Sequence, residues 1–335
     1  MSNPLWTPDP QRAARSQLAQ YSQRAADNHG LELTDYADLH RWSVTDPAAF
    51  WAEVWDFTEI VATQPYQRVV EDFDRFPGAA WFPGARLNFA ENLLRYRDER
   101  PAIVSLLETG ARRELSFAEL HDSTASIAAW LGQMLEPGDR VAGWLPNTPE
   151  AIIAMLATTA CGGVWSSCSP DFGANGALDR FGQIQPRVLF ACDGYHYGGK
   201  TFSTVEKVLE VAAQIESLEA IVWINVVGNE LDPEAATGDA DTAIAFTDLL
   251  AAESGAIDFV PRDFADPLYV MYSSGTTGKP KCIVHSVGGT LIQHLKEHQL
   301  HVDLSRDDRL FFFTTCGWMM WNWLVSGLAS GATLV

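Results

Sequence analysis

Basic residues and cysteines are scarce in this sequence, and each shortage excludes a class of protein. Lysine and arginine number 23 against 43 aspartates and glutamates, so the formal net charge is −20. Because non-specific binding to nucleic acid or to anionic membrane needs clustered basic side chains, both kinds of partner are disfavoured. The five cysteines are odd in number and include no CxxC pair, so we expect buried free thiols in a reducing, cytoplasmic compartment.

Neither end of the chain carries a clear membrane signal. The N-terminus lacks the apolar run of a secretory signal peptide. Residues 310–335 contain no charged side chain, and uncharged runs of about 18 residues or more are candidate membrane spans. Threonine, asparagine and glycine interrupt this run, which favours a packed strand, turn, helix and strand at 310–315, 316–318, 319–330 and 332–335. We therefore expect soluble core here and no stable membrane insertion.

The composition is that of a globular protein with room for roughly two domains. Of the 335 residues, 47% are hydrophobic and 20% are charged. Residues 1–97 predict a helical region, in which Thr45-Asp46-Pro47 begins one helix and residues 88–95 form another. From residue 98 to residue 335 the pattern changes, and we expect a second domain there.

Short apolar strands alternate with helices in this second part. Ser116 and Glu119 form a capping box at the start of one helix, and Thr148-Pro149 begins the next. An acidic stretch at 229–241 is expected to be an exposed loop. The alternation predicts an α/β fold, with a mainly parallel sheet covered by helices on both faces. The predicted strands are 102–107, 140–145, 163–167, 187–191, 220–224, 267–273 and 281–286.

A loop rich in serine, threonine and glycine, residues 273–281, joins the last two of these strands. Glycines allow the backbone to approach a ligand, successive N–H groups can bind an anion, and hydroxyl and lysine side chains add donors and charge. This chemistry suits a polyphosphate. The candidate phosphate-binding residues are Ser273, Ser274, Gly275, Thr276, Thr277, Gly278 and Lys279.

This Ser/Thr/Gly loop differs from the Walker A motif. Its two glycines are separated by two residues, and Pro280 stands where serine or threonine would follow the lysine. Proline also keeps a helix from starting at Lys279 in the Walker manner, so we predict a turn between two strands. A flexible linker is the alternative interpretation, but a linker would not need an apolar strand on each side.

The segment YSSGTTGKPK resembles the phosphate-binding signature of the adenylate-forming acyl-CoA synthetase superfamily. Residues 81–94 resemble the segment before the adenylation domain in short-chain members, and residues 46–60 resemble their N-terminal helical region. DGYHYGGK at 193–200 and TTCGWMMWNW at 314–323 most resemble the acetoacetate-activating members. The resemblance covers nearly the whole chain from about residue 36.

The resemblance implies a two-step ligase reaction. A carboxylate attacks the α-phosphate of ATP, with magnesium, to give an acyl-adenylate and pyrophosphate, and coenzyme A then displaces AMP. The Ser/Thr/Gly loop would hold the β- and γ-phosphates by position and charge, which needs no protein nucleophile. Neither a catalytic residue nor a metal ligand can be assigned within the chain.

The resemblance also implies two further sites. Trp318, Met319 and Met320 would line an acyl pocket shaped for acetoacetate, although simple core packing explains the methionines equally well. Tyr197 and Lys200 would lie near the phosphates of coenzyme A. His285 follows the loop and is as easily a structural histidine as a substrate contact.

Later signatures of the superfamily, including its C-terminal lysine, are absent from residues 1–335. We therefore expect the chain to be the N-terminal portion of an acetoacetate-activating ligase that has no synthetase activity by itself. The alternatives are an acetate- or propionate-activating enzyme and a non-catalytic nucleotide-binding remnant.

Overall fold

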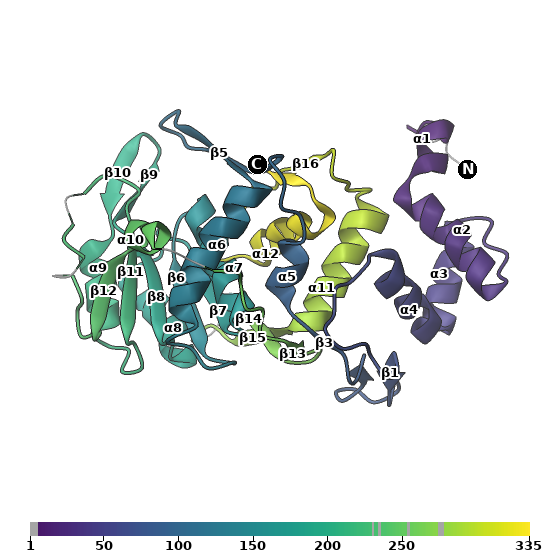
Figure 1. The fold of residues 1–335 in the computed structure, drawn as a ribbon, viewed down its shortest axis with the longest axis horizontal. Coiled ribbons are helices and arrows are strands. Elements are labelled where there is room, and N and C mark those ends of the chain that lie inside the picture. Colours follow the sequence, from purple (N-terminus) through teal and green to yellow (C-terminus); the bar gives the residue numbers. More distant parts are fainter. Residues whose placement is uncertain (1–5, 230, 234–235, 253–254, 274–277) are drawn as a thin grey trace.

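The computed structural model describes all residues except 1–5, 230, 234–235, 253–254 and 274–277. Four helices form the N-terminal end of the molecule, at the right of Figure 1. The side chain of Asp46 accepts a hydrogen bond from the Ala49 N–H at 3.0 Å and Pro47 is the first helical residue, as predicted. The four helices are α1 (Pro10–Arg15), α2 (Gln17–His29), α3 (Tyr36–Thr45) and α4 (Pro47–Phe57).

A buried carboxylate links two of these helices. Glu53 of α4 is only 5% exposed, and its oxygens lie 2.6 Å from Arg24 Nε and 3.3 Å from His29 Nε2 of α2. Asn28 Nδ2 also donates to this carboxylate, at 3.0 Å. Because an unpartnered buried charge would be strongly destabilising, this set of partners fixes how α2 packs on α4.

A seven-stranded sheet forms the centre of the second part. Its order is β12-β11-β8-β6-β7-β14-β15, and only β15 runs antiparallel to its neighbour. This confirms the predicted, mainly parallel α/β architecture. The strands are β6 (Arg140–Trp144), β7 (Val164–Cys168), β8 (Val188–Cys192), β11 (Ala220–Ile224), β12 (Thr242–Ala245), β14 (Pro267–Tyr272) and β15 (Cys282–Ser286).

Helices cover both faces of this sheet (Figure 1). Phe181 of α8 and Val211 of α9 pack on one face, in a cluster that contains Trp144. Leu156 of α7 and Leu249 of α10 belong to the larger cluster on the other face. Alternate strand residues enter the two clusters because successive side chains of a strand point to opposite faces. The covering helices are α6 (Phe117–Leu131), α7 (Pro149–Ala160), α8 (Ala174–Ile184), α9 (Val205–Ala212) and α10 (Phe246–Ala251).

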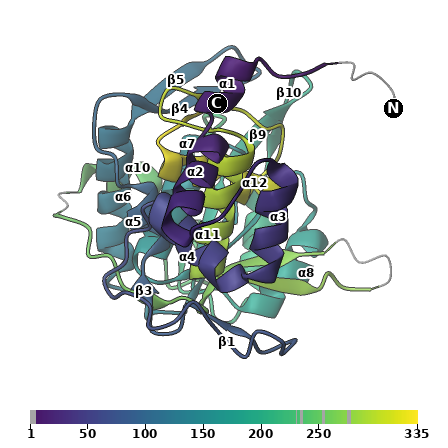
Figure 2. The ribbon, with the colours of Figure 1, turned by 90° about the vertical axis from the view of Figure 1, so that its right-hand side faces the viewer.

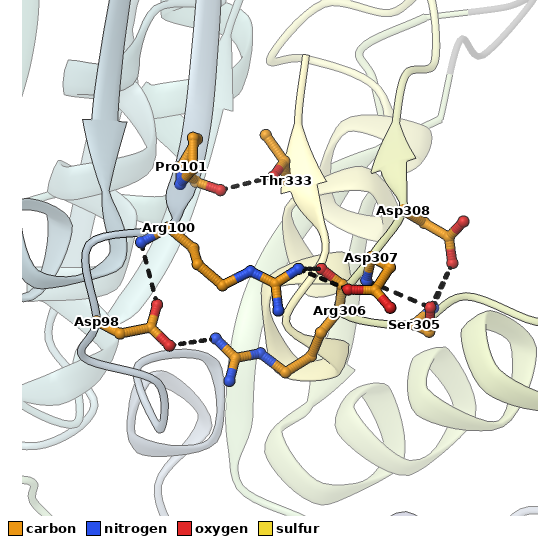
Figure 3. Close-up of polar contacts among 8 residues, drawn as sticks. All are labelled: Asp98, Arg100, Pro101, Ser305, Arg306, Asp307, Asp308 and Thr333. Carbon is orange, nitrogen blue, oxygen red and sulfur yellow. Dashed lines mark hydrogen bonds and ion pairs between the residues drawn. The ribbon is translucent and has the colours of Figure 1, made fainter.

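A second sheet brings the start of this part together with the end of the chain. Its order is β16-β17-β4-β5. Figure 3 shows the polar contacts beside it: Arg306 donates to the Asp98 carboxylate, and Arg100 Nη2 donates to Asp307 Oδ1 at 2.8 Å. Hydrogen bonds from Arg306 lower the pKa of Asp98. The strands are β4 (Pro101–Leu106), β5 (Arg112–Ser116), β16 (Arg309–Leu310) and β17 (Thr333–Leu334).

The predicted strand at 310–315 is wrong over most of its length. Only Arg309–Leu310 is in a strand, paired in parallel with Thr333–Leu334 of β17. The chain then leaves the sheet, and Phe311 and Phe313 are 65% and 90% exposed.

The rest of the uncharged C-terminal run follows the prediction. It forms α12 (Met319–Val325), a 3₁₀ helix (Ser326–Ser330) and β17, most of which are buried. Among the described residues, no helix combines the length and the apolar character needed to cross a membrane. The remaining elements are α5 (Phe89–Leu93), α11 (Val287–Lys296), a π-helix (Glu297–His301), and the short strands β1 (Val70–Glu71), β2 (Ala80–Trp81), β3 (Arg86–Leu87) and β13 (Arg262–Asp263).

The expectation of five buried thiols holds for four of them. Cys161, Cys168, Cys192 and Cys316 are buried, and all five cysteines are unpaired. Cys282 is exposed because β15 is the last strand of the central sheet and has no described strand on its outer side.

The capping box of α6 yields a stability prediction. Ser116 Oγ accepts from the Glu119 N–H at 3.1 Å, and the Glu119 carboxylate accepts from the Ser116 N–H at 2.7 Å. Ser116→Ala should lower the free energy of unfolding by about 1 kcal/mol, measured by urea denaturation. Ser123→Ala, inside the same helix, is the control and should be neutral or slightly stabilising. Equal effects of the two changes would contradict the role of the cap.

Candidate functional site

The candidate site lies where β7 and β14 end. These two strands are parallel neighbours. After β7 the chain continues to β8, which lies on the β6 side of β7 in the sheet. After β14 it continues to β15, which lies on the other side, at the edge of the sheet. In α/β sheets ligands bind in the crevice at the carboxyl ends of strands where the strand order reverses in this way, and a small hollow lined by Ser166, Ser167 and Gly317 marks this place here. The Ser/Thr/Gly loop follows β14 and therefore begins at this crevice.

Both arms of the loop belong to a β-hairpin. Ser273 N–H donates to the Lys281 carbonyl at 3.0 Å, and Tyr272 pairs with Cys282 in the ladder. No helix begins at Lys279 and a strand lies on each side of the loop, as predicted. Gly278 has a φ of +102°, which only glycine adopts without strain. Four candidate phosphate ligands lie outside the described residues: Ser274, Gly275, Thr276 and Thr277.

Helix α8 holds the second arm of the loop. Gln183 Nε2 donates to the Pro280 carbonyl at 2.9 Å, and Lys279 Nζ lies 3.7 Å from Asp179 Oδ1. Lys279 is 75% exposed, and a surface ion pair of this kind contributes little to stability. Its ammonium group is therefore available to an anionic ligand at low energetic cost.

The first arm is fixed from β7. Ser166 Oγ donates to the Val270 carbonyl at 2.7 Å and lies 3.0 Å from Tyr272 Oη. Burial raises the pKa of Tyr272, so its phenol stays neutral. The Arg180 guanidinium lies 5.6 Å from the centroid of the Tyr272 ring and adds positive charge beside the loop.

The next residue of β7 brings in a segment from far along the chain. Ser167 Oγ donates to the Cys316 carbonyl at 2.7 Å. A Cβ on Gly317 would lie 3.6 Å from the Ser169 nitrogen, so this glycine packs closely against the end of β7. The predicted acyl segment and the first arm of the Ser/Thr/Gly loop therefore meet at the same strand end, which sequence spacing alone did not reveal.

The three predicted acyl-pocket residues differ in burial. Trp318 is 62% exposed and Met319 is 42% exposed, whereas Met320 packs against the core. Core packing therefore accounts for Met320 and not for Met319.

Sequence reasoning missed Asn322. This residue is buried within α12 and lines a small hollow with Ser167 and Gly317. Its Nδ2 makes only a weak contact, 3.7 Å to Met271 Sδ, and its Oδ1 has no partner among the described residues. An asparagine inside an otherwise apolar helix was the available signal, since a buried amide needs a polar partner.

The predicted coenzyme A residues lie on a separate hairpin, β9 (Gly194–Tyr197) and β10 (Lys200–Ser203). Tyr197 and Lys200 face each other across its two-glycine turn, and both are exposed. Gly198 and Gly199 have φ of 60° and 71° and donate their N–H groups to the Glu108 carboxylate at 3.1 and 3.0 Å. The turn is thus an anion-binding nest, occupied by a side chain 90 residues away in sequence.

His285 lies away from the loop. It pairs with Tyr269 of β14. In β15 it lies three residues after Cys282, the first strand residue that follows the loop. Burial lowers its pKa, which keeps the imidazole neutral. This position favours the structural interpretation. Among the described residues, no group of three or more histidine, cysteine, aspartate or glutamate side chains is arranged to hold a metal ion.

Two protein families match the chain in adjoining segments. Residues 36–93 match the acetyl-coenzyme A synthetase N-terminus, and residues 89–335 match the AMP-binding enzymes. The second match covers most of the chain and contains the crevice described above. The chain belongs to the AMP-binding enzyme family, as the resemblance predicted.

The individual proteins that the chain resembles within this family include acetoacetyl-CoA synthetases. The chain is 45% identical over 333 residues to the acetoacetyl-coenzyme A synthetase of Rhizobium meliloti (strain 1021), covering 99% of this chain and 50% of that protein. It is 42% identical to acetoacetyl-CoA synthetase of Gallus gallus, covering 100% of this chain and 51% of that one. A solved acetoacetyl-CoA synthetase from Streptomyces lividans superposes with a TM-score of 0.93 at 45% identity, over 100% of this chain and 51% of that chain. The chain thus spans about half the length of the relatives it matches.

The Gly198–Gly199 nest yields a binding prediction. Glu108→Ala should free the two N–H groups for inorganic phosphate, so their NMR chemical shifts should saturate at a phosphate concentration at least about tenfold lower than in the unchanged chain. Glu114→Ala, on the neighbouring strand β5, is the matched control and should leave the titration unchanged. If the phosphate concentration at which these two N–H shifts saturate is the same with and without Glu108, the turn is not an anion site.

Proposed function

We propose that this chain is part of an acetoacetate–CoA ligase. The observation that carries the proposal is the meeting of the first arm of the loop and residues 316–320 at the ends of β7 and β14, through Ser166 and Ser167. The names of the similar proteins support acetoacetate as the acid. In the first step an acetoacetate oxygen bonds to the α-phosphorus of ATP and pyrophosphate leaves. In the second step the thiol of coenzyme A bonds to the acyl carbon and AMP leaves.

The Ser/Thr/Gly loop is proposed to hold ATP, which enters with Mg²⁺. Lys279 supplies charge for the β- and γ-phosphates, and backbone N–H groups and hydroxyls supply hydrogen bonds. The resemblance supports this role for Ser273, Ser274, Gly275, Thr276, Thr277 and Gly278. The weak ion pair of Lys279 with Asp179 is consistent with it, because little is lost when the lysine turns to a phosphate.

Two further assignments complete the proposal. Trp318, Met319 and Met320 form one wall of the acyl pocket, next to Gly317. Tyr197 and Lys200 meet the phosphates of coenzyme A at the β9–β10 hairpin, with Lys200 carrying the charge. We also propose a division into a helical region (1–97) and an adenylation domain (98–335), and a cytoplasmic location.

The role of Lys279 can be tested in an enzyme completed with the other half of the Streptomyces lividans relative. Lys279→Ala should lower the rate of ATP–pyrophosphate exchange at least about tenfold, because charge stabilisation at the transferring group is lost. Thiolysis of supplied acetoacetyl-AMP should change far less, since the β- and γ-phosphates have left by then.

Lys207→Ala on α9, a lysine outside the Ser/Thr/Gly loop, is the charge-matched control and should affect neither step. Equal losses in both steps for Lys279→Ala would contradict the assignment of this lysine to the phosphates.

The chain by itself is expected to form no AMP from ATP, Mg²⁺, acetoacetate and coenzyme A. It spans about half of the enzymes it matches, and the ligase needs groups that its residues do not supply. Turnover by purified 1–335 on the order of 1 per second would refute this.

A further inference from the structure

A groove of about 310 Å³ lies between the N-terminal helices and the end of α11, and none of its lining residues belongs to the candidate site. Figure 2 shows α3 and α4 in front of α11. One wall comes from α2, α3 and α4, and the other from α11 and the π-helix that follows it. We call it the Trp51 groove. Its apolar lining consists of Leu18, Leu39, Val44, Phe50, Trp51 and Leu300.

A single lysine faces this apolar lining. Lys296, the last residue of α11, lies with Nζ 5.7 Å from the centroid of the Trp51 ring. Burial lowers its pKa, as expected for an ammonium group held away from water. Among the described residues, no carboxylate lies within ion-pair distance of it.

The nearest acidic neighbour in sequence is engaged elsewhere. Glu297 accepts hydrogen bonds from Gln293 Nε2 at 2.7 Å and from Trp323 Nε1 at 2.9 Å. The polar residues that line the groove are otherwise Tyr36, His40, Ser43 and His301, and none of them is acidic. In a chain with a net charge of −20, this is a local site for an anion.

We propose that the Trp51 groove binds a small amphipathic carboxylate. The apolar tail lies on Leu39, Phe50 and Leu300, and the carboxylate pairs with the Lys296 ammonium. The ammonium is partly desolvated over an indole, and the Glu297 charge offsets that burial without forming an ion pair with the lysine. A ligand carboxylate would supply a paired counter-charge, while the tail removes apolar surface from water. The volume falls at the lower end of the range of small-molecule pockets, roughly 300–1,000 Å³.

Such a ligand would contact both parts of the chain at once. Leu39 and Phe50 belong to the N-terminal helices, whereas Lys296 and Leu300 belong to the second part. A molecule that binds only when these parts are docked stabilises the docked state by mass action. Binding should therefore raise the melting temperature of the chain as well as release heat.

The test is calorimetric titration of the chain with octanoate near pH 7. Octanoate should bind, and Lys296→Met should raise its dissociation constant at least about tenfold, the loss expected for a charge-assisted contact. Lys207→Met, a lysine on α9, is the matched control and should leave affinity unchanged. Octanol, with the same tail and no charge, should bind at least tenfold more weakly than octanoate.

A second variant tests the groove without touching the lysine. Val44 is 60% exposed, so Val44→Asp should leave the circular dichroism spectrum intact while repelling octanoate from the rim. Failure of the unchanged chain to bind millimolar octanoate, or equal affinity of Lys296→Met and the unchanged chain, overturns the proposal, as does equal binding of octanol. The titration contains no ATP, acetoacetate or coenzyme A, so its failure leaves the ligase proposal standing.

Discussion

The pair Ser166–Ser167 at the carboxyl end of β7 holds the candidate site together. Successive residues of a strand point to opposite faces, so two neighbouring hydroxyls reach two different segments. Ser166 binds the Val270 carbonyl in the strand that leads into the Ser/Thr/Gly loop, and Ser167 binds the Cys316 carbonyl before Gly317. Both donors are buried, so the loss of either hydroxyl would remove a hydrogen bond shielded from water. Two loops separated by dozens of residues are thereby set at one crevice.

Charged groups make the longer connections in the rest of the chain. Glu53 joins α2 to α4, and the contacts of Asp98 and Arg100 with residues 306–307 join the start of the second part to its end. In the first set the Glu53 carboxylate is deeply buried, so its charge depends on its partners. The second set is more exposed, so its ion pairs contribute little, and the pairing of β17 with β4 joins the same two segments. Lys296 differs from these charged groups because it forms no ion pair among the described residues. It is partly buried, and its ammonium group lies over the Trp51 indole.

Local signals predicted most of the elements. Asp46 and Pro47, and the capping box of Ser116 and Glu119, act within one turn of helix, so their effect is legible in a few consecutive residues. The mainly parallel sheet was also predictable, because short apolar strands that alternate with helices can be recognised in consecutive residues. The apolar run at 310–315 is not in a strand beyond Leu310, because strand formation depends on pairing with a distant segment, which a local apolar pattern does not encode. Cys282 is exposed for a related reason, its place at the edge of the sheet.

The sequence by itself determined the chemistry of the Ser/Thr/Gly loop and the family, because both depend on residue types within short continuous segments. It also determined that Pro280 would keep a helix from starting there. Only the tertiary structure decided which distant groups meet: Ser167 with Cys316, Glu108 with the Gly198–Gly199 turn, and Lys296 with Trp51. Such contacts join residues that are far apart in the chain, and their geometry follows from strand order and helix packing, which no local pattern encodes.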